Sequence, residues 1–218
     1  MFVTHIIKAT GISGAEKHLL TLLPGLVDEG IDVCLLILED PAQPVPHFVE
    51  RAEALGVPAK TVPILHHIDS GLLPRLRWHL EAQRPDILHT HLFHADTYGL
   101  LAKGLAGVPY AVSSRHNDDR FRSNRAFKVF NRYVSGSADR LIAISDHIAR
   151  FTVEVEGLPA QRIVTIPYGL APTASASSLR VQQRTDWGYD DETPVIGFFG
   201  RLVEQKGVDV LLQAFAEV

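Results

Sequence analysis

The sequence has one cysteine, no long apolar run and little excess of charge, and each shortage excludes a class of protein. Cys34 has no partner for an internal disulfide, and its place in the apolar run VCLLIL is typical of a buried thiol in a reducing compartment. No apolar run approaches the ~18 residues of a membrane span and the N-terminus has no secretory signal pattern, so we expect a cytoplasmic protein. A net charge of −4 argues against nucleic acid as a partner.

The chain does contain a repeated pattern of short apolar runs and amphipathic stretches. The apolar runs are nearly continuous, which is typical of parallel strands covered by helices on both faces. The expected strands are 2–9, 32–38, 60–65, 86–92, 110–114, 140–145 and 162–167, and the expected helices are Ala15–Glu29 and the stretches near 47–55, 72–84, 95–106, 123–135, 146–156 and 177–187. The pattern predicts a Rossmann-like, doubly wound α/β domain, with Pro24 kinking or shortening the first helix.

This pattern divides the chain near residue 170. After a first domain of residues 1–170, the stretch LAPTASASS is small, polar and proline-containing, so we expect a linker over residues 171–189. The apolar run PVIGFFG then predicts a strand that starts a second α/β domain at residues 190–218. One strand and one helix are too little to bury a sheet, so we expect this second domain to be truncated.

Ligands of an open parallel sheet bind beyond the carboxyl ends of its strands, and four loops there carry unusual residues. The first loop, Gly11–Glu16, is the turn from the first strand into the first helix. Glycines let a backbone approach a phosphate and the helix N-terminus offers it free N–H groups, although a plain tight turn explains the same pattern. The loop is not G-x-G-x-x-G, which disfavours a dinucleotide dehydrogenase.

Histidines cluster in the second loop, HTHLFH, at residues 89–94. His89 and His91 point to the same face of a strand and could share a metal with His94. No cysteine is near and the nearby carboxylates have no ligand spacing, so we expect no metal. Polar lining of a cleft and hydrogen-bonded strand histidines are the favoured interpretations.

The third and fourth loops are polar and basic. Ser113–Asp119 ends a buried strand with SSRHNDD, which is costly unless these groups are solvated or functional; a loop with helix-capping aspartates is the alternative. Gly200–Gly207 places Arg201 and Lys206 on a loop that leads into a helix. Two such cations can clamp a diphosphate, whereas a solvated loop with unrelated charges is the alternative.

Five stretches occur in an order that resembles a known family: GISGAEKHLLTLL, RPDILHTHLFHADTYGLLAKGLAGVPYAVSSRHN, ADRLIAIS, RIVTIPYG and GRLVEQKG. They are similar to the retaining, nucleotide-sugar-dependent glycosyltransferases of family four, which have the GT-B fold. In that family the first Rossmann-like domain binds mainly the acceptor and the second mainly the sugar nucleotide. The resemblance implies transfer of a sugar, with retention, from a nucleotide-diphosphate sugar to a glycan or lipid-linked acceptor, without a metal or other cofactor.

The resemblance also assigns roles to residues. It implies that His116 is the catalytic cleft histidine and contacts the transferred sugar, and that Gly14, Arg201 and Lys206 hold the donor diphosphate. On the acceptor side we expect Ser13, Glu16, His91, Arg115 and Asn117. Tyr168-Gly169-Leu170-Ala171 departs from the family's Asn-Gly-acid segment. The family's paired glutamates fall beyond Val218, so we expect these 218 residues to be incomplete and inactive alone.

Other interpretations stay open. The chain could be a non-catalytic or split acceptor-binding subunit, or a sugar-nucleotide epimerase of similar fold. The segment Arg120–Tyr133 holds five cations, four aromatic residues and no acid. That composition favours peripheral contact with an anionic membrane, at its inner face, or a basic helix whose aromatic residues face the core.

Overall fold

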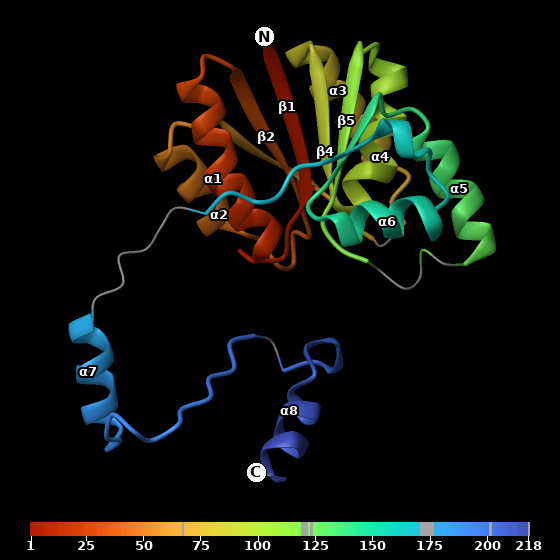
Figure 1. Ribbon diagram of the computed structural model, residues 1–218. Helices are drawn as coiled ribbons and strands as arrows, with labels where there is room; N and C mark the ends of the chain where they lie inside the picture. The colour runs from red at the N-terminus through yellow and green to blue at the C-terminus, as the bar shows by residue number, and fades with distance from the viewer. Residues whose placement is uncertain (67, 119–121, 123, 171–176, 201, 218) are drawn as a thin grey trace. The chain divides into compact units, whose positions relative to one another are not determined.

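The protein is described by a computed structural model that divides into two units, Met1–Ala171 and Pro172–Val218 (Figure 1). The structure describes residues 1–66, 68–118, 122, 124–170, 177–200 and 202–217. Arg201 and part of the expected linker, residues 171–176, lie outside these residues.

The first unit is built on a seven-stranded sheet. Its strands are β1 (Phe2–Lys8), β2 (Asp32–Glu39), β3 (Ala59–Pro63), β4 (Ile87–His91), β5 (Tyr110–Arg115), β6 (Arg140–Ala143) and β7 (Ile163–Thr165). They lie in the order β3-β2-β1-β4-β5-β6-β7 and every neighbouring pair is parallel. The expected Rossmann-like sheet is confirmed. The strand order reverses between β1 and β4, so a ligand site is expected at their carboxyl ends.

Helices cover both faces of this sheet (Figure 1). They are α1 (Gly14–Asp28), α2 (Pro46–Ala54), α3 (Leu72–Gln83), α4 (Leu92–Ala106), α5 (Arg125–Ser135) and α6 (Asp146–Glu154), with a short 3-10 turn η2 (Ala160–Arg162). A hydrophobic core lies on each face of the sheet. Neighbouring residues of β1 belong to different cores, because successive side chains of a strand point to opposite faces. Ile7 packs with α1 and α2, whereas Ile6 packs with α3 and α4.

Helix α1 contains Pro24, which the sequence predicts to kink or shorten the helix. The helix is not shortened: it runs through Pro24 to Asp28. A proline in a helix removes one backbone hydrogen bond, and here the burial of Leu19 and Leu23 in the core stabilises the turns around it.

The second unit contains α7 (Ser177–Asp186), a 3-10 turn η3 (Glu204–Lys206) and α8 (Val208–Phe215). The prediction that PVIGFFG forms a strand is wrong, because residues 194–200 have no strand structure. A strand needs a hydrogen-bonded neighbour, and the described part of this unit offers none. The segment instead borders a hollow of about 470 Å³ with α8, and Phe199 is 98% exposed.

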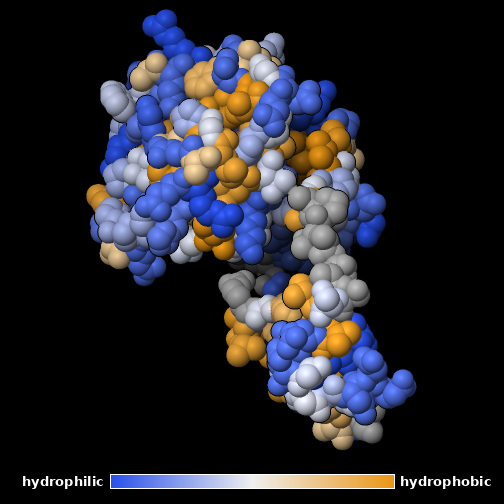
Figure 2. Space-filling view, turned by 90° about the vertical axis from the view of Figure 1, so that its left-hand side faces the viewer, coloured by the Kyte–Doolittle hydropathy of each residue, from blue (hydrophilic) through white to orange (hydrophobic). Residues whose placement is uncertain are grey.

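The surface of the first unit on the side of α1 and α2 is mostly hydrophilic, with hydrophobic side chains in small scattered groups (Figure 2). Among the described residues, no helix combines the length and the apolarity that crossing a bilayer requires.

Candidate functional site

Four segments meet the carboxyl ends of the central strands: the loop before α1, the turn from β4 into α4, the loop after β5, and the chain after β7. The turn into α4 is strained, because Leu92 has a φ of 69° in the left-handed region that glycine favours. This geometry ends β4 at His91 and starts the helix at once. The loop after β5 begins with His116.

His116 is hydrogen-bonded through both ring nitrogens. Its Nε2 lies 3.1 Å from Nδ1 of His91, and its Nδ1 is hydrogen-bonded to the hydroxyl of Tyr168. His18 of α1 stacks on the Tyr168 ring, with centroids 4.0 Å apart and planes 13° apart. Both His116 and Tyr168 are partly exposed, so the pair can meet a ligand.

Three buried histidines lie behind His116. His5 of β1 is in register with His89 of β4, and His91 follows two residues later on the same face. Nδ1 of His5 lies 3.0 Å from Nε2 of His91, and Nε2 of His89 lies 2.8 Å from the hydroxyl of Ser114. Among the described residues, His5, His89 and His91 form a group whose possible metal-ligand atoms lie within 4.8 Å of one another. The sequence pattern had grouped His94, and not His5, with the two strand histidines.

Burial keeps these imidazoles neutral. Desolvation, with a smaller repulsion from His18, lowers the pKa of His116 and of His5 to about 3. Desolvation also lowers the pKa of His89 and His91 well below the usual 6.5. Burial and the nearby Glu16 carboxylate raise the pKa of Tyr168 to about 12, so its hydroxyl keeps its proton. The site therefore offers neutral hydrogen-bonding groups around neutral pH.

The N-terminus of α1 is open at Gly14. Gly14 is exposed, and a Cβ placed on it would meet no described atom within 4 Å other than its chain neighbours and the backbone of its own helix. Glu16 is only 4% exposed, and its carboxylate accepts hydrogen bonds from the N–H and hydroxyl of Ser13. Glu16 and Ser13 thus cap the helix, while Gly14 leaves room for a ligand.

The structure revises the expected role of Arg115. Its side chain is 2% exposed and lies inside the unit, where it pairs with Asp96 and with Glu156. Its guanidinium also donates to the hydroxyl of Ser135 at 2.6 Å. Side chains alternate along β5, so Arg115 points to the face opposite that of Ser114. Arg115 is a structural residue in this position, not an acceptor contact.

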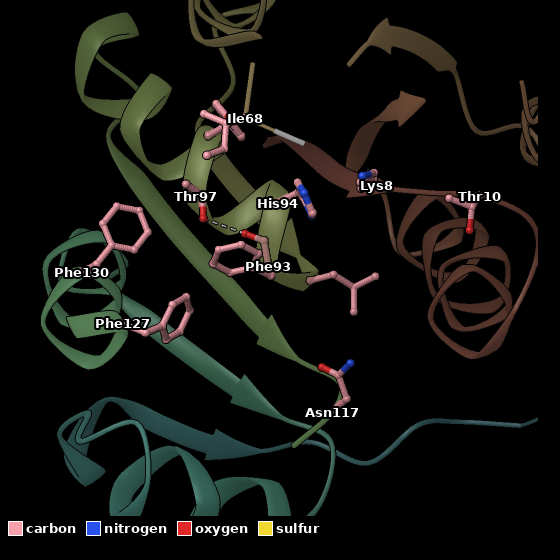
Figure 3. A pocket seen from close by; sticks show the side chains of 11 residues that line it. Lys8, Thr10, Ile68, Phe93, His94, Thr97, Asn117, Phe127 and Phe130 are labelled. Carbon is pink, nitrogen blue, oxygen red and sulfur yellow. Dashed lines mark hydrogen bonds between the residues drawn. The ribbon is translucent and has the colours of Figure 1, made fainter. Parts of the chain in front are cut away.

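A pocket of about 700 Å³ opens beside this site (Figure 3). Phe93 of α4 and Phe127 and Phe130 of α5 form an aromatic wall, with Phe93 and Phe127 5.3 Å apart between ring centroids. Asn117, next to His116, lies at the opposite side, and Lys8 lies at the end of β1 (Figure 3). His94 lines this pocket. The pocket is mainly apolar with a few polar groups, as is typical of small-molecule sites.

Of the two cations expected to bind a diphosphate, the structure describes only Lys206. Arg201 lies outside the described residues. Lys206 is exposed and ends η3, immediately before Gly207, whose φ of 63° turns the chain into α8. Their role in holding a diphosphate stays a prediction.

Sequence reasoning missed His5 and His18, and it noted Tyr168 only as a departure from a family motif. His5 stands inside an apolar run, and His18 stands on an amphipathic helix, so neither breaks a local pattern. The register of β1 with β4 and the contact of α1 with the chain after β7 bring them to the site.

Known proteins resemble this chain in sequence. The family model of the glycosyl transferase 4-like domain matches residues 13–169. The D-inositol 3-phosphate glycosyltransferase of Nocardia farcinica is 30% identical over 149 residues, which are 68% of this chain and 29% of that protein. The phosphatidyl-myo-inositol mannosyltransferase of Mycolicibacterium smegmatis is 27% identical over 216 residues, which are 94% of this chain and 52% of that protein. The chain thus spans about half or less of the length of these curated relatives.

Solved structures resemble it in fold. Anabaena HepE in complex with UDP matches with a TM-score of 0.78 at 18% identity, covering 100% of this chain and 58% of that one. The UDP-GlcNAc 2-epimerase of Methanocaldococcus jannaschii matches with a lower TM-score of 0.56 at 14% identity, covering 77% and 46%. The GT-B type of Rossmann-like fold is therefore confirmed. On the match over residues 13–169, this chain belongs to the family of glycosyltransferases that share the glycosyl transferase 4-like domain.

Proposed function

We propose that the complete gene product transfers a sugar from a nucleotide-diphosphate sugar to an acceptor hydroxyl, with retention at the anomeric carbon. The observation that carries this proposal is the arrangement of His116 and Tyr168 beside α1, whose N-terminus is open at Gly14. An exposed helix N-terminus attracts a diphosphate, and neutral donors beside it suit sugar hydroxyls. Anabaena HepE, which shares the fold, binds UDP, and this supports a nucleotide donor.

The chemistry assigned to the chain's own residues is electrostatic. Negative charge grows on the leaving phosphate as the sugar–phosphate bond breaks, and backbone N–H groups at Gly14 stabilise that charge. His116 contacts the transferred sugar with the edge of its neutral ring, because both of its nitrogens are hydrogen-bonded to His91 and Tyr168. Lys206 and Arg201 are assigned to binding a diphosphate, as the family resemblance implies. Retention, with the leaving phosphate accepting the acceptor's proton, is the course expected from the family, and no metal takes part.

The acceptor proposed for the first unit carries an apolar portion. The aromatic wall of Phe93, Phe127 and Phe130 lies in the same pocket as Asn117, which is next to His116. A hydroxyl presented to His116 would therefore extend into an apolar pocket, which suits a lipid-linked or aryl-linked glycan better than a free sugar.

The test is transfer by the complete gene product from a panel of UDP- and GDP-sugars to free, alkyl-linked and aryl-linked glycosides. We expect one donor to support transfer, with alkyl or aryl acceptors preferred and the product's anomeric configuration equal to the donor's. Replacement Gly14→Ala should raise the donor KM about tenfold, because its new methyl group meets only the ligand. Gly104→Ala is the matched control, since Gly104 is also exposed with open space but lies far along α4. Absence of transfer from every donor, or an unchanged donor KM in Gly14→Ala, contradicts the proposal.

Peripheral contact with an anionic membrane is proposed for the exposed side of α5. Arg122 is buried against Glu156, so this cation of the basic segment is not available to a membrane. Phe127 and Phe130 line the pocket, although Phe130 is also 40% exposed. Arg120 and Phe121 lie outside the described residues. Arg125 and Arg132 stay exposed.

In vesicle co-sedimentation, the double variant Arg125→Ala, Arg132→Ala should bind anionic vesicles about thirtyfold more weakly, at about 1 kcal/mol for each removed charge. Arg51→Ala on α2 is the control, because Arg51 is an exposed arginine of another helix. Equal recovery of the unmodified protein with anionic and neutral vesicles at low salt refutes the membrane contact.

A further inference from the structure

A chain of hydrogen bonds runs from the open site into the core. It links Tyr168 to His116, His116 to His91, and His91 to His5. His91 and His116 each use one ring nitrogen toward each neighbour. The rings of His5 and His91 are 14° apart with centroids 5.3 Å apart, and they meet through nitrogens 3.0 Å apart. The chain is therefore continuous from the partly exposed Tyr168 to the fully buried His5.

The protons along such a chain cannot be placed independently. A neutral imidazole has one N–H donor and one bare nitrogen acceptor. Burial keeps His5, His91 and His116 neutral, so each donates in one direction and accepts from the other. Only two arrangements satisfy every bond: all three rings carry the proton on Nδ1, or all three carry it on Nε2.

The buried end of the chain distinguishes these arrangements. Nε2 of His5 is buried and makes no hydrogen bond to any residue that the structure describes. With the protons on Nε2, this atom would be an unpaired buried N–H donor, which native structures strongly avoid. With the protons on Nδ1, Nε2 of His5 is a bare nitrogen, and the N–H groups of all three histidines have an acceptor.

We propose that His5 and His91 are positioning residues that hold His116 in its Nδ1–H tautomer, so that Tyr168 accepts from His116 and presents its own O–H to an oxygen atom of the substrate. The role of Tyr168 rests on the proposed function, because that function names the substrate. The tautomer of His116 does not depend on the proposed function. His18 holds the ring of Tyr168 in place by stacking. The oxygen bound by Tyr168 belongs to a sugar hydroxyl or a phosphate, which both accept hydrogen bonds.

A metal is the competing interpretation of the same histidines. Two nitrogen ligands of a tetrahedral zinc ion lie about 3.3 Å apart, each 2.0–2.1 Å from the metal. Nδ1 of His5 and Nε2 of His91 are already hydrogen-bonded to each other at 3.0 Å, and Nε2 of His89 is hydrogen-bonded to Ser114. A metal ion would have to separate the first pair and break the chain that reaches Tyr168.

The tautomers can be read by two-bond proton–nitrogen correlation spectra of the protein labelled with ¹⁵N at histidine. At pH 7 we expect His5, His91 and His116 each to show a protonated Nδ1 and a bare Nε2. The exposed His147 is the comparison: its Nε2 lies 3.2 Å from the Asp118 carboxylate, so it should show Nε2–H. An Nε2–H tautomer at His116, or shifts typical of a metal-bound ring on adding one equivalent of Zn²⁺, overturns the proposal.

Variants at position 5 test the coupling at a distance. His5→Leu removes the donor to His91, so His91 and His116 should move toward Nε2–H although His116 is two links away. His5→Asn keeps an N–H near the position of Nδ1 and should restore the Nδ1–H tautomer of His116. An unchanged tautomer of His116 in His5→Leu overturns the coupling, and if that variant does not fold, the tautomer of the unmodified protein decides alone.

Kinetics of Tyr168→Phe test the ligand contact in the complete gene product. Loss of one hydrogen bond of about 1.4 kcal/mol should raise one KM about tenfold. A rise in the donor KM assigns the oxygen to the nucleotide sugar, and a rise in the acceptor KM assigns it to the acceptor. If both KM values and kcat are unchanged, Tyr168 does not bind substrate. The spectra need no substrate, so a failed transferase assay does not affect the tautomer test.

Discussion

Replacing His116 with alanine should lower the kcat of the complete gene product about a hundredfold, as expected for loss of one preorganised contact with the reacting sugar. His116 lies at the carboxyl end of β5 with both ring nitrogens engaged, so its orientation is fixed before substrate binds. A group positioned in this way acts on the transition state more than on substrate affinity. We therefore expect kcat to fall with little change in either KM.

His47→Ala is the control for this experiment. His47 is an exposed histidine of α2, and its replacement should leave kcat unchanged. Thermal unfolding of the His116 variant must show a folded protein, because its removal also leaves nitrogen Nδ1 of His91 without a partner. A folded variant that keeps its rate refutes the catalytic role.

The pKa of His116 gives the same experiment a pH signature. Burial, with His18, His89 and Arg115, lowers this pKa to about 3, so His116 is neutral wherever the enzyme is assayed. The rate should show no step from His116 between pH 5 and 8, at about the usual histidine pKa of 6.5. Its folded pKa lies below the unfolded one, so the stabilising effect of neutral His116 is complete above pH 6.5 and is lost as the pH falls from 6.5 toward about 3.

The fold of the first unit could be predicted because its strands are continuous apolar runs. The run at 32–38 became β2 at Asp32–Glu39, since a strand buried on both faces needs apolar residues at every position. PVIGFFG is also a nearly continuous apolar run and is not a strand. Composition indicates that a segment can be buried, but a strand also requires a neighbour to bond, and the neighbour depends on the rest of the chain.

The site could be predicted less well, because sequence locates a loop but not the direction of its side chains. Arg115 and His116 are adjacent in a polar run, and the pleat of β5 sends the first into the core and leaves the second at the site. The sequence did not indicate His5 as a site residue, since a histidine inside an apolar run is interpreted as part of a strand. Its role depends on the register of β1 with β4, which no local pattern encodes.

A second feature that sequence did not indicate is a buried network of charges beneath the site. Glu156 accepts a hydrogen bond from Asn131 at 2.7 Å and pairs with Arg115 at 3.3 Å and with Arg122 at 3.4 Å. Arg115 pairs further with Asp96 of α4. All four charged side chains are almost fully buried. The network therefore joins α4, α5 and the segment just after α6 to β5, which ends immediately before His116.

Glu156→Ala should lower the free energy of unfolding by about 3–5 kcal/mol, because removing one partner of a buried ion pair leaves uncompensated charge in the core. Here one carboxylate serves two guanidinium groups, so both Arg115 and Arg122 lose a partner. Glu156→Gln should cost less, since its amide oxygen can still accept from Asn131. Glu81→Ala is the matched control: Glu81 bonds Arg77 at 2.7 Å on the exposed face of α3, and that pair should contribute only about 0.3–0.5 kcal/mol. Urea unfolding of the three variants measures these differences in the free energy of unfolding. If Glu156→Ala lowers this free energy as little as Glu81→Ala does, water solvates the network and its ion pairs do not stabilise the fold.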